Sequence, residues 1–294
     1  MNLYIVESPL QVICAYESIL ENKEKNYDFY IRLTGRGKND LHTICCAEFF
    51  NIRYKTFKFS PNSLKLDFIL NIGLWVKFIF LKRDAVYFGS IFSKTLNFIK
   101  NIIKYNEIVY LDDGAATLKA YDLMFKKDFK IENLFTFFNL KPLSGQNISV
   151  HKLNGIKSKL DSKKSKGLYF IGQPYENMLG FSKEEYIMSV SRAALNCKKG
   201  EYLNYIPHRM EDISIINDID NVKILEIDMP IELYFIKESD FSPLYIYSCY
   251  STALLTLKLL YPDAFIYAIK PEKSKINELD SIYYYFEKNG INLI

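Results

Sequence analysis

Short apolar runs alternate with longer amphipathic stretches along the first half of the chain. Runs of this kind, rich in Ile, Val, Leu, Tyr and Phe, are typical of strands buried in a parallel sheet. They occur at residues 3–6, 29–33, 53–57, 85–88 and 108–111. Ser8 and Pro9 follow the first run as an N-cap and a first-turn proline, which predicts that a helix begins there. The alternation predicts a doubly wound, mostly parallel sheet.

The same rhythm restarts after a polar segment. Residues 154–167 are rich in Lys, Ser, Gly and Asp, which predicts a surface linker. Beyond it, strands are expected at residues 168–171, 202–206, 223–225, 244–247 and 264–268. Helices are expected at residues 183–195, 231–238, 252–260 and 277–288. The predicted fold class is therefore α/β, with two Rossmann-like domains facing a cleft, formed by residues 1–155 and 156–294.

Composition is that of a globular protein and restricts the partners only weakly. The 294 residues are enough for two domains, with 49% apolar and 24% charged residues. A net charge of +4 falls short of a nucleic-acid-binding footprint, so no nucleic-acid partner is expected. That charge is compatible with an anionic ligand or an anionic membrane surface.

Cysteines and apolar segments indicate the compartment. The five cysteines include no C-x-x-C pair, which favours a reducing cytosol over a disulfide framework or a zinc site. The chain enters its first strand without a signal-like segment. The most apolar run, residues 68–81, is shorter than the roughly 20 residues of a spanning helix and predicts a buried helix, with contact at a membrane interface as the alternative. A cytoplasmic protein is expected, either free or peripheral to the inner membrane.

Of the three histidines, one follows a predicted strand. His208 comes directly after strand 202–206 and is followed by Arg209. Ligands of open α/β sheets bind outside the carboxyl ends of the strands, and a histidine there can exchange a proton near neutral pH. The alternative is a loop histidine without a role.

Two further loops after strands carry carboxylates. Asp112, Asp113 and Gly114 follow strand 108–111, and because adjacent carboxylates repel, one can stay basic enough to accept a proton. The alternative is an acidic turn. Gly172 and Pro174 follow strand 168–171, where glycine permits close backbone approach; Glu176 is a second candidate base there, and an ordinary β-turn is the alternative.

Two predicted helix starts could bind a nucleotide. Ser251 and Thr252 open helix 252–260, where hydroxyls and backbone N–H groups at the positive end of the dipole suit a phosphate. Glu232 opens helix 231–238 and could hold ribose hydroxyls. An N-cap and a carboxylate that complements the helix dipole are the alternatives.

Several common motifs are absent from the sequence. There is no G-x-G-x-x-G, Walker A or H-E-x-x-H motif, and no D-x-D flanked by apolar strands. Dinucleotide enzymes, NTPases and metal-dependent nucleotide-sugar transferases are therefore disfavoured.

Taken in order, these loops resemble the motifs of bacterial sialyltransferases with the two-domain GT-B fold. The most similar is glycosyltransferase family 52, the lipooligosaccharide sialyltransferases. The similar segments are D-D-G at 112–114, G-x-P at 172–174, P-H at 207–208, the blocks 231–258 and 267–271, and P-L-Q at 9–11. The resemblance spans nearly the whole chain, and the ordered set is more specific than any single motif.

The resemblance implies an activity and a set of roles. The donor would be CMP-sialic acid and the acceptor a terminal galactoside of a surface glycan such as lipooligosaccharide or capsule, in an inverting reaction without metal or cofactor. His208 would be the general acid, or hydrogen-bond donor, to the departing CMP phosphate. Ser251 and Thr252 would bind that phosphate, and Glu232 the ribose. The other residues expected to bind substrate are Ser8, Gln11, Asp112, Gly114, Gly172, Pro174 and Arg209.

The resemblance also carries expectations about domains and assembly. The first domain would be the acceptor side and the second the donor side, with the last helix packing back on the first domain. Relatives that dimerise make a homodimer compatible with the sequence.

The sequence departs from the family pattern at two positions. Arg209 stands where the family often has proline, and its guanidinium could clamp a phosphate or carboxylate. Tyr175 stands where some relatives have an aspartate base directly after G-x-P, so that either Glu176 or Asp113 would be the base. The alternatives in function are transfer from another CMP- or UDP-activated sugar, a nucleotide-sugar epimerase, and a non-catalytic nucleotide-sugar-binding protein.

Overall fold

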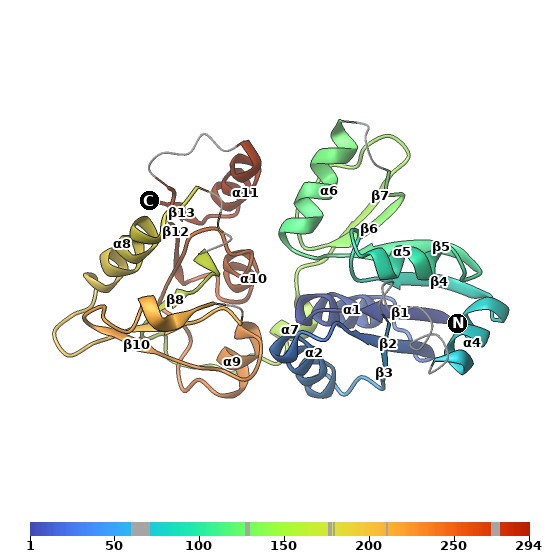
Figure 1. Ribbon diagram of the computed structural model, residues 1–294, viewed down its shortest axis with the longest axis horizontal. Helices are drawn as coiled ribbons and strands as arrows, with labels where there is room; N and C mark the ends of the chain where they lie inside the picture. Colours follow the sequence, from blue (N-terminus) through green and yellow to red (C-terminus); the bar gives the residue numbers. More distant parts are fainter. Residues whose placement is uncertain (60–70, 127–129, 176–177, 179, 210, 272–276) are drawn as a thin grey trace. The chain divides into compact units, whose positions relative to one another are not determined.

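The chain forms two compact domains, Met1–Ser158 and Lys159–Ile294. The computed structural model describes all residues except 60–70, 127–129, 176–177, 179, 210 and 272–276. Each domain contains one sheet flanked by helices, and the strands paired within the described residues run parallel (Figure 1). This arrangement confirms the predicted α/β class with two Rossmann-like sheets.

The N-terminal sheet has the strand order β3-β2-β1-β4-β5-β6-β7. Its strands are β1 (Asn2–Val6), β2 (Tyr27–Leu33), β3 (Lys55–Lys58), β4 (Arg83–Phe88), β5 (Tyr105–Leu111), β6 (Asn133–Thr136) and β7 (Asn147–Val150). The connecting helices are α1 (Pro9–Glu21), α2 (Gly37–Phe49), α4 (Ile72–Phe80), α5 (Lys94–Lys100), α6 (Ala115–Phe125) and α7 (Asn154–Lys157). The order reverses between β1 and β4, and such a switch point is where open α/β sheets bind ligands.

Alternating side chains in these strands face opposite helix layers. Tyr4 stacks on Tyr87 with ring centroids 4.3 Å apart, and its hydroxyl lies 3.2 Å from Ser18 of α1. Tyr30 points to the other face, where its ring packs edge-on against Phe78 of α4. The period of two in a strand thus supplies a core on both faces of the sheet.

The C-terminal sheet has the strand order β10-β9-β8-β11-β12-β13. Its strands are β8 (Leu168–Ile171), β9 (Leu203–Ile206), β10 (Val222–Ile224), β11 (Tyr245–Ser248), β12 (Phe265–Ala268) and β13 (Asn292–Leu293). Its helices are α8 (Lys183–Ala194), α9 (Ile231–Lys237), α10 (Ala253–Leu260) and α11 (Asn277–Lys288). Here the order reverses between β8 and β11.

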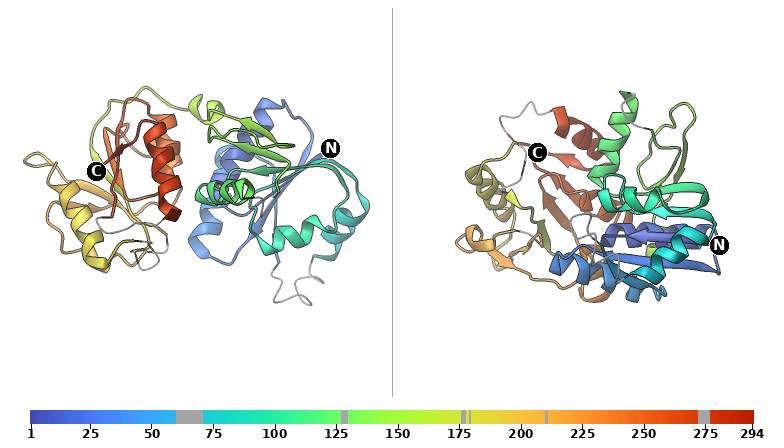
Figure 2. Two further views of the ribbon diagram at one scale, coloured as in Figure 1. Left: turned by 90° about the horizontal axis from the view of Figure 1, so that it is seen from above. Right: turned by 45° about the vertical axis from the view of Figure 1, so that its right-hand side comes forward.

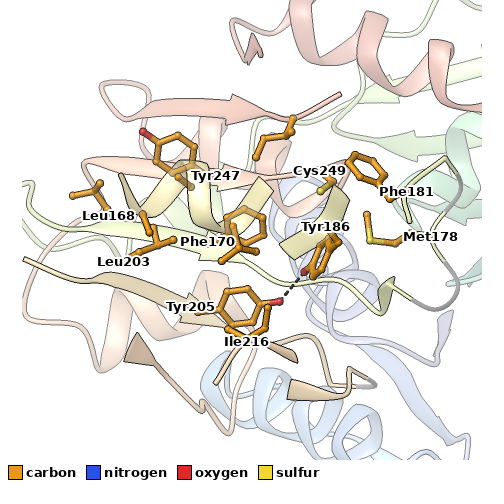
Figure 3. Close-up of a cluster of buried hydrophobic side chains, with 14 residues drawn as sticks. Leu168, Phe170, Met178, Phe181, Tyr186, Leu203, Tyr205, Ile216, Tyr247 and Cys249 are labelled. Carbon is orange, nitrogen blue, oxygen red and sulfur yellow. Dashed lines mark hydrogen bonds between the residues drawn. The ribbon is translucent and has the colours of Figure 1, made fainter. Parts of the chain in front are cut away.

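The core of the C-terminal domain follows the same alternation. Phe170 faces α8 and stacks on Tyr205, whereas the neighbouring Tyr169 packs edge-on against Phe235 of α9. Figures 1 and 2 show α8 on one face of this sheet and α10 on the other. The cluster under α8 includes the side chains drawn in Figure 3, among them Tyr186 and Cys249.

Apart from the apolar segment 68–81, the ends of the expected strands and helices lie within three residues of those observed. Three strands were not predicted. β7 is largely exposed and polar, β13 has two residues, and β6 lies in a phenylalanine-rich stretch without a clear period. The predicted linker also begins too early, because residues 154–157 form α7. The buried carboxylate of Glu17 on α1 accepts hydrogen bonds from the backbone N–H groups of Gly155 and Ile156, at 2.9 and 2.8 Å.

The apolar segment at 68–81 differs from its prediction. Residues 72–80 form α4, while 68–70 lie outside the described residues. Trp75 and Phe78 are buried, but Ile72 and Phe80 are exposed, so the prediction of a buried helix is wrong for one face. Among the described helices, none is long and apolar enough to cross a bilayer.

Candidate active site

The predicted site residues lie at the carboxyl edges of the two sheets. In the N-terminal domain, Ser8 and Gln11 follow β1, and Asp112, Asp113 and Gly114 follow β5. In the C-terminal domain, Gly172 and Pro174 follow β8, His208 and Arg209 follow β9, and Ser251 and Thr252 follow β11. β1 and β8 each flank the switch point of their sheet. The predicted base Glu176 lies outside the described residues.

Gln11 connects the loop after β1 to Asp113. Its side chain is buried, its Oε1 accepts a hydrogen bond from the backbone N–H of Glu7 at 2.7 Å, and its Nε2 donates to Asp113 Oδ1 at 2.6 Å. Gly89, which follows β4, leaves room for this side chain, since a Cβ there would overlap the Gln11 amide. Gln11 therefore orients the partly exposed carboxylate of Asp113.

Asp112 has a different environment from its neighbour. It is fully buried, its Oδ1 accepts a hydrogen bond from the backbone N–H of Gly114 at 2.7 Å, and its Oδ2 accepts one from the Thr136 hydroxyl. Burial raises the pKa of Asp112 to about 7, opposed by these hydrogen bonds. Asp112 thus stabilises the loop through buried hydrogen bonds, and Asp113 is the carboxylate of the pair that is partly exposed to solvent.

The raised pKa of Asp112 predicts a pH dependence of stability. In the folded protein Asp112 keeps its proton up to about pH 7, whereas an aspartate in the unfolded chain loses its proton at about pH 4. Between these values the folded state holds more protons, so the contribution of Asp112 to the free energy of unfolding falls as pH rises. In this window the free energy of unfolding of the wild type should fall, relative to that of Asp112→Asn, by up to about 1.4 kcal/mol for each unit of rising pH. Urea unfolding at several pH values measures it.

Exposed Asp263 serves as the matched control, because an Asp263→Asn variant should follow the wild-type pH profile. If the Asp112→Asn and wild-type profiles run parallel from pH 4 to 7, the raised pKa of Asp112 is refuted.

The sequence did not single out Glu7, which also lies at this edge. Its buried carboxylate is ion-paired with Arg32 and accepts a hydrogen bond from the Ser93 hydroxyl at 2.8 Å. Its backbone carbonyl accepts one from the Asn39 amide at 2.9 Å. These partners come from three separate segments, so no local pattern in the sequence reveals them.

Glu211 holds the His208 loop in the C-terminal domain. Its Oε2 accepts a hydrogen bond from the backbone N–H of His208 at 2.9 Å, and its own N–H donates to the His208 carbonyl at 2.9 Å. Its Oε1 accepts from the buried Tyr205 hydroxyl and, at 3.1 Å, from the Tyr186 hydroxyl. Sequence analysis missed Glu211, although a carboxylate three residues after His208 is the spacing that such a turn uses.

Gly172 is required by this network. A Cβ at residue 172 would overlap Glu211 Oε2 and lie 2.7 Å from the Tyr205 hydroxyl oxygen. Because residue 172 has no side chain, the loop after β8 can contact the loop after β9. This is the close backbone approach expected of this glycine. Pro174, two residues on, is half-buried.

His208 is half-buried and carries a perturbed imidazole. Burial lowers its pKa to about 4, with a smaller contribution from the positive charge of Arg209. The imidazole of the free protein is therefore neutral at pH 7 and offers one N–H donor and one acceptor nitrogen. A bound anion would raise this pKa, because it stabilises the imidazolium.

Gln173 joins the loop after β8 to the loop after β11. Its side-chain Oε1 accepts a hydrogen bond from the backbone N–H of Tyr250 at 2.9 Å, and its backbone N–H donates one to the Tyr186 hydroxyl at 2.8 Å. Helix α10 begins at Ala253, with Thr252 as its N-cap. The Ser251 hydroxyl lies 3.4 Å from the Ala253 nitrogen. Ser251 and Thr252 thus lie at the start of α10, as predicted, in a loop that is hydrogen-bonded to Gln173.

Glu232 lies against a neighbouring helix. It is buried in the first turn of α9, its Oε1 accepts a hydrogen bond from the Thr256 hydroxyl of α10 at 2.6 Å, and burial raises its pKa. A ribose would have to use the second carboxylate oxygen. In the part of the chain that the structure describes, no three His, Cys, Asp or Glu side chains are grouped as metal ligands.

Comparison with known proteins identifies the fold. No protein-family model matches the chain, and no curated protein matches its sequence. The structure of Escherichia coli heptosyltransferase WaaC with ADP matches with a TM-score of 0.52 at 8% identity, over 100% of this chain and 92% of that one. A UDP-GlcNAc 2-epimerase from Neisseria meningitidis bound to UDP-GlcNAc matches with 0.52 at 12% identity, over 99% and 94%.

A third match is a putative UDP-N-acetylglucosamine 2-epimerase from Listeria monocytogenes, with a TM-score of 0.55 at 10% identity over 96% of this chain and 81% of that one. With its two parallel Rossmann-like sheets, the chain has the GT-B fold of glycosyltransferases. Membership of glycosyltransferase family 52 stays a prediction.

Proposed function

We propose that the protein is a glycosyltransferase that uses a nucleotide sugar, and specifically an inverting, metal-independent sialyltransferase. It would move sialic acid from CMP-sialic acid to a terminal galactoside of a surface glycan such as lipooligosaccharide or capsule. The observation that carries this proposal is the cluster of His208, Gly172 and the Ser251 loop at one sheet edge, joined through Glu211 and Gln173.

The C-terminal cluster suits a departing phosphate. Breaking the sialyl–phosphate bond develops positive charge on the sugar and negative charge on the phosphate, so donors placed at the phosphate lower the barrier. The His208 N–H, the Ser251 hydroxyl and the N-terminus of α10 are donors of this kind. The exposed Arg209 adds a guanidinium next to His208. Negative charge on the bound phosphate raises the pKa of His208 from about 4, so that the imidazole can take up a proton from solvent and then donate it to the departing phosphate.

The base would come from Asp113 or Glu176. Asp113 is partly exposed, held by Gln11, and next to the buried Asp112, and these features support it as an acceptor of the galactoside proton. Glu176 follows Gly172 and Pro174 closely in sequence and is the second candidate.

The structural neighbours support a nucleotide-sugar donor and leave a second candidate function. One neighbour contains ADP and another UDP-GlcNAc. Because two of the neighbours are described as 2-epimerases, a nucleotide-sugar epimerase is the runner-up. An epimerase would act without an acceptor, which separates the two functions experimentally.

The test is incubation of the purified protein with CMP-sialic acid and lactose, with and without a chelator, and separately with UDP-GlcNAc alone. We expect sialyl-lactose and CMP in equal amounts, unchanged by the chelator. Absence of both transfer and CMP release contradicts the sialyltransferase, and conversion of UDP-GlcNAc without an acceptor identifies the epimerase. Loss of transfer upon chelation contradicts only the metal-independent mechanism.

A further inference from the structure

Helix α4 presents an apolar stripe to solvent. The side chains of Ile72, Val76 and Phe80 are 61%, 49% and 71% exposed, and Ile79 and Leu81 are exposed beside them. Positions 72, 76, 79 and 80 lie on one side of a helix because of its 3.6-residue turn. Large apolar side chains gathered on one exposed surface are typical of sites that bind a protein or a membrane.

The opposite side of α4 anchors the helix to its domain. Trp75 packs edge-on against Phe59 at 4.9 Å between ring centroids, and Phe78 packs against Tyr30 at 5.6 Å. At the start of the helix, the Asn71 amide donates a hydrogen bond to the Lys58 carbonyl at the end of β3. The stripe is therefore displayed by a helix whose other face belongs to the core, at the periphery of the N-terminal domain (Figure 1).

The charged residues in the segment that contains the stripe are all basic. Residues 71–83 contain Lys77, Lys82 and Arg83 and no Asp or Glu. Lys77 is exposed at the margin of the stripe, and Lys82 lines an open depression of about 700 Å³ together with Lys100 and Lys104. The buried Arg83 is ion-paired with the partly exposed Asp28 at 2.8 Å.

Carboxylates near the stripe do not cancel this charge. Asp84 follows Arg83 and is ion-paired with the amino group of Met1. Glu107 is exposed two residues beyond Tyr105, which lines the same depression. The lysines therefore outnumber the carboxylates at this end of the helix.

We infer that this surface of α4 docks on an anionic lipid bilayer. Its apolar side chains would enter the interface in the plane of the membrane, while Lys77, Lys82 and Lys104 contact headgroup phosphates. The complementarity of an apolar stripe with a basic margin favours lipid over a protein partner or a second copy of the chain. The inference is independent of the proposed sialyltransferase activity, since it uses none of the candidate site residues.

The test is co-sedimentation with vesicles of phosphatidylcholine alone and of phosphatidylcholine mixed with phosphatidylglycerol. We expect binding to the anionic vesicles that weakens as salt is raised. The stripe variant Val76→Glu/Phe80→Glu should lower the partition coefficient at least about tenfold, and Lys77→Glu/Lys82→Glu should lower binding to anionic vesicles specifically. Leu195→Glu, which changes an exposed leucine at the end of α8, is the matched control and should bind as the wild type does.

Three results would overturn the inference. The wild type could stay in the supernatant with anionic vesicles, or the stripe variant could bind as well as the wild type. Light scattering could also reveal a dimer that the stripe variant loses, with no vesicle binding, and the partner of α4 would then be a second copy of the chain. Thermal unfolding of each variant verifies that it is folded.

Discussion

His208→Ala should lower the turnover of CMP-sialic acid by about two orders of magnitude or more. The imidazole supplies the donor for the departing phosphate in the proposed mechanism, and alanine offers none. The loop itself should survive, because Glu211 holds residue 208 through its backbone N–H and carbonyl, which alanine retains. Steady-state kinetics with lactose as acceptor measures the loss, and an unchanged melting temperature shows that the fold persists.

The pH profile distinguishes the two roles of His208. The pKa of about 4 makes the imidazole neutral in the free protein at pH 7. If the neutral ring is the competent donor, kcat/KM should not fall between pH 5 and 8 through His208, since this parameter reports on the free enzyme. A steady fall across that range, absent in His208→Ala, would mean that the imidazolium must be present before the donor binds. Near-normal turnover of His208→Ala returns His208 to a loop residue without a catalytic role.

Asp113→Asn should lower transfer by about two to four orders of magnitude if Asp113 is the base. The asparagine has nearly the same shape and can still accept the hydrogen bond from Gln11, so the change removes the charge and leaves the geometry. The KM for CMP-sialic acid should change little, because the proposed donor site belongs to the C-terminal domain. Initial rates at saturating lactose measure the effect.

Glu176→Gln is the matched variant for the second candidate base. Loss of transfer in Glu176→Gln with normal transfer in Asp113→Asn would assign the base to Glu176. Normal rates in both variants would remove both carboxylates from the mechanism.

The apolar runs in the sequence correctly predicted most strands, and with them the positions of the loops. Runs such as residues 3–6 and 168–171 are continuously apolar, whereas a half-buried strand alternates apolar and polar residues. They therefore indicated parallel sheets with helices on both faces. Since carboxyl ends of parallel strands share one edge, the sequence could also indicate that His208 and the Ser251 loop lie at the same edge. β6 could not be predicted in this way, and it supplies Thr136, the partner of Asp112.

Hydropathy alone did not predict how α4 packs. Both of its faces are apolar in sequence, and hydropathy does not distinguish a core face from an exposed one. Only the contacts of Trp75 and Phe78 with side chains from β2 and the end of β3 decide which face is buried. The same contacts leave Ile72 and Phe80 at the surface.

The sequence by itself determined the α/β class, the two successive sheets and the placement of chemically active residues directly after strands, because these follow from the local period of apolar side chains. Tertiary structure alone decided which of two adjacent aspartates is buried, how Gln11 reaches Asp113, and why residue 172 must be glycine. These features depend on atoms brought together from segments up to 102 residues apart. Burial opposed by hydrogen bonds sets the protonation of Asp112, and burial is the main cause for His208, with a smaller effect of the adjacent Arg209. Burial is not encoded in the neighbouring residues alone.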